Sequence, residues 1–243
     1  MISDGQSVPV PPLMLEPPRW LRWIRFHLTE ASYEAAREYF PVPGGKGAAY
    51  FNYRLEHVRQ VERQALELLR EVGGDAEVVL AAVWLHDFFQ PGFHEEKHGP
   101  RAAIWAAGKL KPLGFPAEKI DAVCLAVSRH SEPPGTLPVD AHEARIFWDA
   151  HNLSYLGPFA AITDLINYLA ADRLRKICSG AQLLTVEAIF RAGLDPSGGK
   201  GLQPYQFYFE ASRTWAAERL RVQREFYECC RRQLGLDSRP DSA

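Results

Sequence analysis

The chain has 243 residues, which suits one large domain or two small ones, and hydrophobic residues make up 47% of it, enough for a sizeable core. Its 28 basic and 30 acidic residues give a formal net charge of -2, so the overall charge provides no attraction to nucleic acid or to an anionic membrane. No apolar stretch approaches the roughly 20 residues that a membrane span needs. Residues 1–18 also lack the basic start and apolar core of a signal peptide.

Composition divides the chain into a long middle part and two short ends. Residues 1–18 are rich in proline and are expected to form an extended arm, and residues 237–243 a flexible tail. Residues 19–236 are expected to form one domain, whose motifs lie within about residues 49–178. The cysteines form no Cys-x-x-Cys pair, so we interpret them as reduced thiols of a cytoplasmic protein; they are Cys124, Cys178, Cys229 and Cys230.

Helical periodicity begins at residues 19–39 and continues at residues 49–72, where His57 lies at the edge of an apolar stripe. Residues 78–89 are apolar on every side until His86 and Asp87. Asp75 precedes this run as an N-cap, so we predict a fully buried helix. A buried carboxylate without a partner costs several kcal/mol, and a bound cation would remove that cost.

The second half of the chain continues in the same way. Helices are predicted at residues 102–110 and from Pro116 to His130, which lies at the inward end of an apolar stripe. Asp140 and Glu143 are expected to form a capping pair for the next helix, on which Asp149 falls at a core position. Further helices are expected from residue 157, at residues 183–192 and at residues 206–234. No strand pattern is convincing, so the prediction is an all-α, single-domain helical bundle.

Two groups of residues could bind a metal. The string from His94 to His98 matches H-E-x-x-H, the signature of zinc peptidases, which requires both histidines on one face of a helix. Prolines and glycines flank the string on both sides and leave no room for such a helix, so the zinc peptidase is a remote alternative. The other group is dispersed over predicted helices and consists of His57, His86, Asp87 and Asp149.

At these residues the chain resembles the HD-domain superfamily of metal-dependent phosphohydrolases, whose pattern is a histidine, an adjacent His-Asp pair and a distant aspartate. The apolar residues before His86 and Asp87, the stretch that ends in His130 and Ser131, and the helix that carries Asp149 are all similar to family segments. The resemblance covers about residues 57–171 and implies a helical bundle of the HD-domain type. It also implies that His57, His86, Asp87 and Asp149 bind a divalent metal.

The chain departs from the family after Asp149. The family usually reads Asp-Ala-Asp-x-Leu-Asp there, whereas His151 and Ser154 replace the second and third acids. The groups around the metal or the substrate are therefore expected to differ. Apart from this departure, we interpret four histidines as surface residues, and they are His27, His94, His142 and His151.

The resemblance implies hydrolysis of a phosphate ester or anhydride of a small molecule, above all a nucleotide. A metal-activated water would attack the phosphorus, and His86 and Asp87 would be the catalytic pair. A site of two imidazoles and two carboxylates suits Mn, Fe, Co, Ni and Zn alike, so the residues do not identify the metal. One metal is favoured over two, because an extra adjacent histidine of binuclear members is missing. The residues expected to contact phosphate are Lys97, His98, Arg101, Arg129 and His130. Binding of a second metal by this group is the less favoured interpretation.

The altered stretch after Asp149 leaves a second function open, that of a non-catalytic regulator that binds metal or nucleotide on the same scaffold. Neither a nucleic-acid polymer nor a membrane is expected as a partner. Exposed aromatic side chains near Trp20 and Trp23 would permit a homodimer.

Overall fold

The computed structural model describes residues 16–42, 45, 47–90, 97–168 and 201–236. Within these residues the regular structure is helical, apart from one isolated bridge between Pro41 and Ala49, and the all-α prediction is confirmed. Among the described residues, short 3-10 turns lie at Lys111–Leu113, Ala117–Lys119 and Pro204–Gln206. The α-helices are α2 (Arg19–Tyr39), α3 (Tyr53–Val72), α4 (Ala76–Leu85), α5 (His98–Lys109), α6 (Ile120–Arg129), α7 (His142–Leu153), α8 (Pro158–Tyr168) and α11 (Glu210–Gln233).

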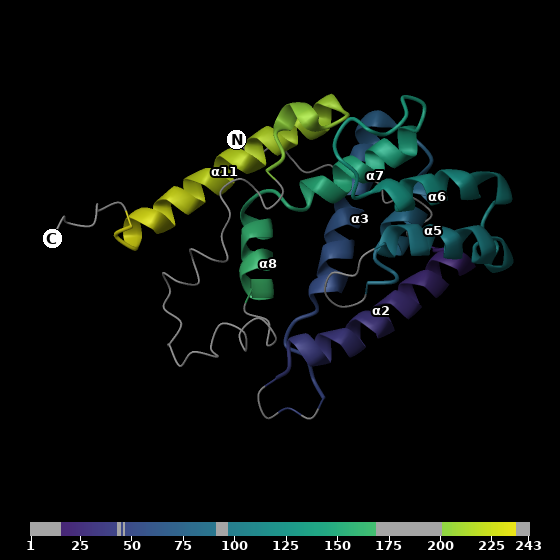
Figure 1. Ribbon diagram of the computed structural model, residues 1–243, viewed down its shortest axis with the longest axis horizontal. Helices are drawn as coiled ribbons and strands as arrows, with labels where there is room; N and C mark the ends of the chain where they lie inside the picture. The colour runs from purple at the N-terminus through teal and green to yellow at the C-terminus, as the bar shows by residue number, and fades with distance from the viewer. Residues whose placement is uncertain (1–15, 43–44, 46, 91–96, 169–200, 237–243) are drawn as a thin grey trace.

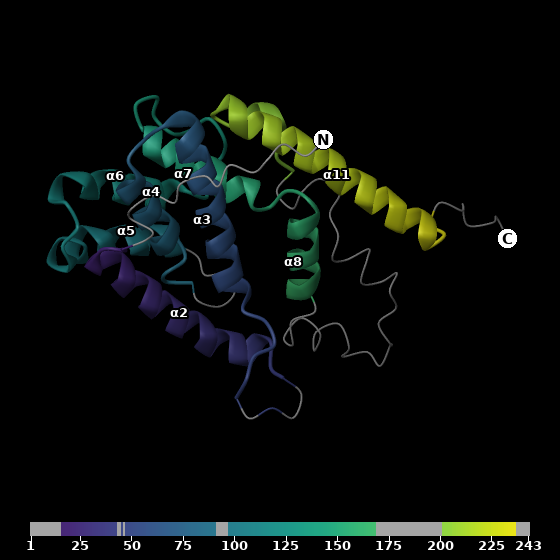
Figure 2. The same ribbon diagram turned by 180° about the vertical axis from the view of Figure 1, so that it is seen from behind.

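The centre of the bundle is α4, which contacts α2, α3, α6 and α7 (Figures 1 and 2). Every residue from Val78 to Leu85 is buried, because this helix is apolar on all sides and every neighbour covers one of its faces. The Asp75 carboxylate caps its start and accepts hydrogen bonds from the backbone N–H groups of Glu77 and Val78. In both views α11 crosses the bundle beside α7 and extends away from it toward the C-terminus.

The predicted helix at residues 78–89 is too long. It ends at Leu85, and residues 86–89 form a turn that begins with His86 as the C-cap. The turn directs two adjacent polar side chains, those of His86 and Asp87, away from the apolar helix and toward α3 and α5. Helix α3 begins at Tyr53 rather than at residue 49, because the side chain of Asn52 caps it by accepting the backbone N–H of Leu55.

The capping pair predicted at Asp140 and Glu143 is also wrong. Helix α7 begins after Ala141, and no side chain caps it. The Glu143 carboxylate instead accepts the backbone N–H of Asp75, 3.1 Å away, and so connects the starts of α4 and α7. Glu143 thus contacts the start of another helix instead of capping its own.

Of the aromatic residues of α2, the two tryptophans are not exposed side chains, whereas Phe26 is 61% exposed. Trp20 is 1% exposed and meets Phe115 edge to face, with ring centroids 4.9 Å apart. Trp23 is partly buried and stacks on Trp105 at 5.4 Å. The homodimer stays a prediction, which the exposed Phe26 permits and the two tryptophans do not support.

Some sequence predictions fall outside the described residues: most of the N-terminal arm, the tail, the helix at residues 183–192, His94 and Cys178. Cys124, Cys229 and Cys230 are free thiols. Across the described residues, no helix combines the length and the apolar character needed to span a membrane.

Candidate metal centre

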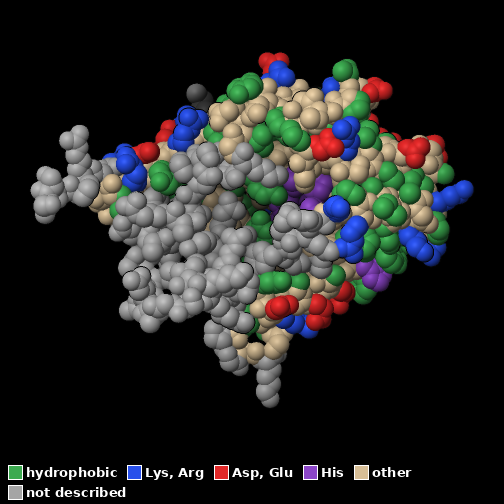
Figure 3. Space-filling view, in the orientation of Figure 1, with side chains coloured by type: hydrophobic (Ala, Val, Ile, Leu, Met, Phe, Trp, Pro, Cys, Tyr) green, Lys and Arg blue, Asp and Glu red, His purple; other side chains and the backbone are tan. Residues whose placement is uncertain are grey.

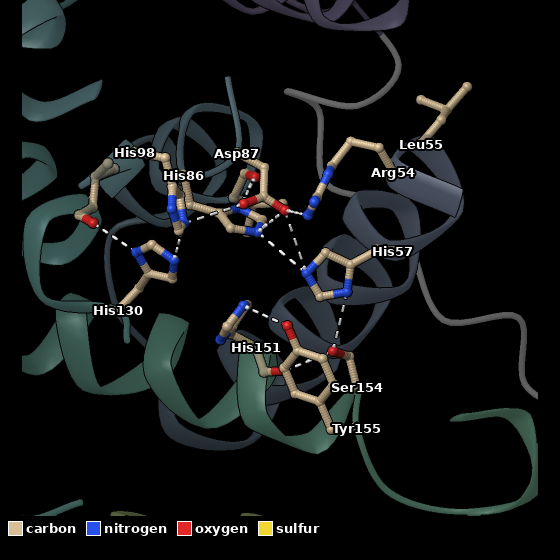
Figure 4. A network of polar contacts seen from close by, with 12 residues as sticks. Arg54, Leu55, His57, His86, Asp87, His98, His130, His151, Ser154 and Tyr155 are labelled. Atoms are coloured by element: carbon tan, nitrogen blue, oxygen red, sulfur yellow. Dashed lines mark hydrogen bonds and ion pairs between the residues drawn. The ribbon is translucent and has the colours of Figure 1, made fainter. Parts of the chain in front are cut away.

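Three histidines from separate parts of the chain meet in the interior. His57 lies on α3, His86 follows α4 and His151 lies on α7, and one nitrogen of each ring lies within 4.8 Å of the other two (Figure 4). All three are buried, with exposed fractions of 4%, 0% and 2%. The structure thus confirms that His57 and His86 converge, and it adds His151, which we had interpreted as a surface residue.

Hydrogen bonds to the far side of two of these rings assign their tautomers. Nδ1 of His86 lies 2.7 Å from the carbonyl oxygen of Val83, which can only accept, so Nδ1 carries the hydrogen. The Ser154 hydroxyl donates to the carbonyl oxygen of His151 at 2.6 Å, so its oxygen accepts from Nδ1 of His57 at 3.4 Å. In a neutral ring with Nδ1–H, Nε2 carries an unshared electron pair.

Nε2 of His57 and Nε2 of His86 face each other, 3.3 Å apart. With Nδ1 of each ring bonded to an oxygen, both Nε2 atoms are the ones that could bind a shared cation. Two nitrogens bound to one cation at about 2.0–2.1 Å would lie roughly 2.8–3.4 Å apart at angles of about 90–110°. The observed spacing and the donor type therefore fit a divalent transition-metal ion.

Asp87 lies beside this group and is ionised. Its Oδ2 is 3.2 Å from Nε2 of His86 and 3.7 Å from Nε2 of His57, and it forms an ion pair with Arg54. Burial by itself would raise the pKa of Asp87. The charge of Arg54, followed by the two imidazoles, outweighs burial and holds that pKa well below its ordinary value. A carboxylate in this state is ready to bind a cation.

The other oxygen of Asp87 faces a second histidine pair. Oδ1 lies 3.5 Å from Nε2 of His98, which in turn lies 3.1 Å from Nε2 of His130. Burial lowers the pKa of His130 to about 3, so this ring is neutral, and its Nδ1 donates to the carbonyl oxygen of Val127 at 2.8 Å. Asp87, His98 and His130 thus form a second group that could hold a metal ion, and Asp87 borders both groups.

The fourth predicted ligand, Asp149, does not reach the centre. Its carboxylate accepts hydrogen bonds from the backbone N–H groups of Tyr208 and Phe209 at 3.0–3.1 Å, at the start of α11. Residues 149 and 151 are about 200° apart around a helix, so they point to different neighbours. Burial raises the pKa of Asp149 to about 6, although these hydrogen bonds oppose the rise. The structure therefore does not bring Asp149 together with the other predicted ligands, and His151 from the same helix lies beside His57 and His86 instead.

A cavity of about 420 Å³ opens onto both groups, and its lining includes Arg54, Asp87, His98, His130 and His151. The space-filling view shows histidine surface inside a recess on this face (Figure 3). Arg54 is 6% exposed, and sequence reasoning missed it. The available signal was its position three residues before His57, which places both side chains on the same face of α3.

None of the three other predicted phosphate contacts is among the described residues that line this cavity. Lys97 precedes α5 in a left-handed conformation with φ of 60° and is exposed. The guanidinium of Arg101 lies over the Phe89 ring, 5.0 Å from its centroid. Arg129 pairs with Glu132 at 2.8 Å. A role for any of the three in binding phosphate stays a prediction that this placement does not support.

The H-E-x-x-H string lies partly outside the described residues, because His94 is not among them. Helix α5 begins at His98, after Lys97 in a left-handed conformation. Among the described residues, Nε2 of His98 lies beside Nε2 of His130, which follows α6. His98 thus belongs to the second group, with Asp87 and His130.

Comparison with known proteins gives a family and a fold. Residues 54–172 match the sequence model of the family described as HD domain. The structure of a predicted HD superfamily hydrolase from an uncultured Thermotogales bacterium matches with 20% identity and a TM-score of 0.55. The match covers 91% of this chain and 97% of the bacterial protein. An HD-superfamily hydrolase from Bacillus thuringiensis has 15% identity and a TM-score of 0.52, with coverage of 89% and 98%.

A third solved structure is that of Bacillus subtilis YpgQ in complex with ADP, with 16% identity and a TM-score of 0.52. The match covers 93% of this chain and 100% of the YpgQ chain. At these identities the likeness shows a shared fold. No curated protein matches the chain.

Proposed function

The chain belongs to the HD-domain superfamily, and from this premise we propose that it is a metal-dependent phosphohydrolase that acts on a small phosphorylated molecule. One observation carries the proposal: nitrogen atoms of His57, His86 and His151 converge beside the ionised Asp87 at the wall of a cavity. Perturbed ionisable groups that converge in a cavity mark a functional site. The hydrolase names of the structural neighbours point in the same direction.

The residues that would hold the metal are His57, His86 and His151, with Asp87 as the oxygen donor. Three imidazoles and a carboxylate, all buried, form a suitable set for a divalent transition metal. When bound, such an ion would supply Lewis-acid polarisation of a phosphoryl oxygen and make a nearby water more acidic. Asp149 has no part in this set, because its oxygens accept from the start of α11.

Asp87 is better suited to orient the attacking water than to deprotonate it. Its pKa lies well below the ordinary value, because the charge of Arg54 and the imidazoles outweighs burial. A carboxylate with so low a pKa is a weak base, but it accepts a hydrogen bond from water readily. Its Oδ1 faces the second histidine pair, so a water held there would lie between the two groups.

Arg54 is the cation best placed to bind the substrate phosphate, since it is permanently charged and lines the cavity. His98 and His130 lie opposite, and we propose that they contact phosphate oxygens. Because both lie close to Asp87, binding of a second cation is the alternative role of this histidine pair. The number of metal ions per chain distinguishes the two roles: one ion supports the phosphate contact, and two ions indicate that the pair binds the second cation.

A nucleotide is the substrate class that we propose. A cavity of about 420 Å³ is large enough for a small ligand of this size, and one structural neighbour is described in complex with ADP. The alternative is a regulator that binds metal or nucleotide without hydrolysing it. We also propose that the protein acts in the cytoplasm, where its free thiols would stay reduced.

The test is release of phosphate from a panel of nucleoside mono-, di- and triphosphates and simple phosphate esters, with each divalent metal in turn and with a chelator. We expect metal-dependent release that His86→Ala reduces at least about a hundredfold. His142→Ala, on α7 but outside the centre, should retain the activity. Metal and nucleotide binding without phosphate release would establish the regulator instead, and absence of bound metal would overturn both functions.

A further inference from the structure

We propose that this centre selects nitrogen-preferring borderline cations such as Co²⁺, Ni²⁺ and Zn²⁺ over Mn²⁺ and Mg²⁺, and that His151 sets this selectivity. The inference rests on the proposed metal centre but not on the proposed hydrolysis. It concerns the kind of donor atom that the chain offers, which the fold alone does not determine.

The donor set is rich in nitrogen. His57, His86 and His151 supply three imidazoles, whereas Asp87 supplies the carboxylate. Imidazole suits Zn, Cu, Fe and Ni, and carboxylate, carbonyl and water oxygens suit Mg, Ca and Mn. A centre in which imidazoles outnumber carboxylates among the described donors therefore favours the first class.

Arg54 strengthens this preference. Its guanidinium forms an ion pair with Oδ2 of Asp87, the oxygen nearest to His86 and His57. A carboxylate that shares its charge with a guanidinium attracts a hard cation less strongly. Cations that bind mainly through oxygen lose more from this competition than cations that bind mainly through nitrogen.

His151 is held in place by its neighbours. Its ring centroid lies 5.0 Å from that of His86, 5.3 Å from that of His57 and 5.0 Å from that of His130, and its Nε2 lies 3.3 Å from the Tyr155 hydroxyl. A buried ring with aromatic neighbours on several sides cannot turn away from the centre (Figure 4). Of the three imidazoles, it is the one at a position where the family pattern has an acid.

The experiment measures metal affinities of the metal-stripped protein by competition titration. Ni²⁺ binds more tightly than Mn²⁺ at almost any site of mixed nitrogen and oxygen donors, so the informative quantity is the ratio of their dissociation constants. In His151→Asp we expect the preference for Ni²⁺ over Mn²⁺ to fall at least about tenfold. His142→Asp makes the same chemical change on the same helix, outside the centre, and should leave the ratio within about threefold of wild type.

A second readout is the absorption spectrum of the Co²⁺-loaded protein, which reports the donor atoms directly. The spectrum should change in His151→Asp and stay the same in His142→Asp. If His151→Asp does not fold, His151→Gln replaces it, and its loss of Ni²⁺ affinity should exceed its loss of Mn²⁺ affinity.

The outcomes separate the two proposals. An unchanged affinity ratio and Co²⁺ spectrum in a folded His151→Asp protein would overturn the selectivity proposal, even if the wild type hydrolyses nucleotides. Selective Ni²⁺ binding without any phosphate release would support selectivity and refute the hydrolase. A wild-type protein that binds none of these ions would overturn both.

Discussion

Asp149 and His151 lie two residues apart on α7 and serve different parts of the molecule. The Asp149 carboxylate accepts the backbone N–H groups of Tyr208 and Phe209 at the start of α11, whereas the His151 ring packs against His57 and His86. One helix thus attaches α11 to the bundle with one face and completes the candidate metal centre with another.

Asp149→Ala should therefore lower stability without removing metal. It would leave the backbone N–H groups of Tyr208 and Phe209 without this acceptor, and we expect a loss of about 1–3 kcal/mol in the free energy of unfolding. Asp149→Asn keeps one acceptor oxygen and should lose less. Denaturant unfolding and metal content per chain are the measurements. Loss of metal from a variant with wild-type stability would return Asp149 to the ligand set.

Arg54→Gln should change two binding reactions in opposite directions. Loss of the guanidinium would remove the proposed phosphate contact, so KM should rise about tenfold, equivalent to about 1.4 kcal/mol. The same change leaves Asp87 without the ion pair, so metal should bind more tightly. Steady-state kinetics and metal titration of one preparation measure both effects.

Arg54→Lys is the matched control, because it keeps the charge but loses the planar arrangement of donors. Its KM and metal affinity should lie between those of wild type and Arg54→Gln. If both constants moved in the same direction in Arg54→Gln, the proposed division of roles would be refuted.

Gly99→Ala should disturb the packing of α5 on α6 beside the centre. A Cβ at residue 99 would lie 2.8 Å from the carbonyl oxygen of Val127 and 3.0 Å from Cε1 of His130. A backbone carbonyl cannot move aside cheaply, so we expect a destabilisation of about 1–3 kcal/mol. Thermal unfolding measures it, and a histidine-resolved NMR spectrum should show a shift of the His130 signals.

Gly108→Ala, on the same helix, is the control. A Cβ there would have nothing within 4 Å, so the substitution should stabilise α5 by roughly 0.4–1 kcal/mol. Equal effects of the two substitutions would show that close approach at Gly99 has no energetic importance.

Asp75 should make stability depend on pH in the acid range. Burial would raise its pKa, but Lys119 and the N–H groups of Glu77 and Val78 outweigh burial and lower that pKa in the folded protein. The unfolded chain then binds more protons than the folded one, so the contribution of Asp75 is present above about pH 4 and is lost as pH falls through the folded pKa.

Asp75→Asn keeps a capping oxygen but loses the charge, whereas Asp75→Ala also loses the cap, which costs about 1 kcal/mol. Urea unfolding at about pH 7 and pH 3 should show that the deficit of Asp75→Asn relative to wild type shrinks in acid. A deficit that is independent of pH would mean that the Asp75 charge does not contribute.

The sequence by itself determined the helical class and the residues of α2, which follow from helical periodicity. That His57 lies beside His86 and Asp87 was implied by the resemblance to the HD-domain superfamily, and the local rules indicated only that the buried polar pair needs a partner. Helix α4 could be recognised as the central helix because its residues from Val78 to Leu85 are apolar on every face.

The tertiary structure decided which residue of α7 belongs to the centre and that Arg54 accompanies Asp87. Helix α7 is buried at every position from Ile146 to Leu153, so its hydrophobic pattern cannot tell which buried face meets which neighbour. Asp149 and His151 are both interior, and the difference between them arises from the positions of α3 and α11, which no local sequence pattern specifies. Long-range packing assigned the carboxylate to the start of α11 and the imidazole to the centre.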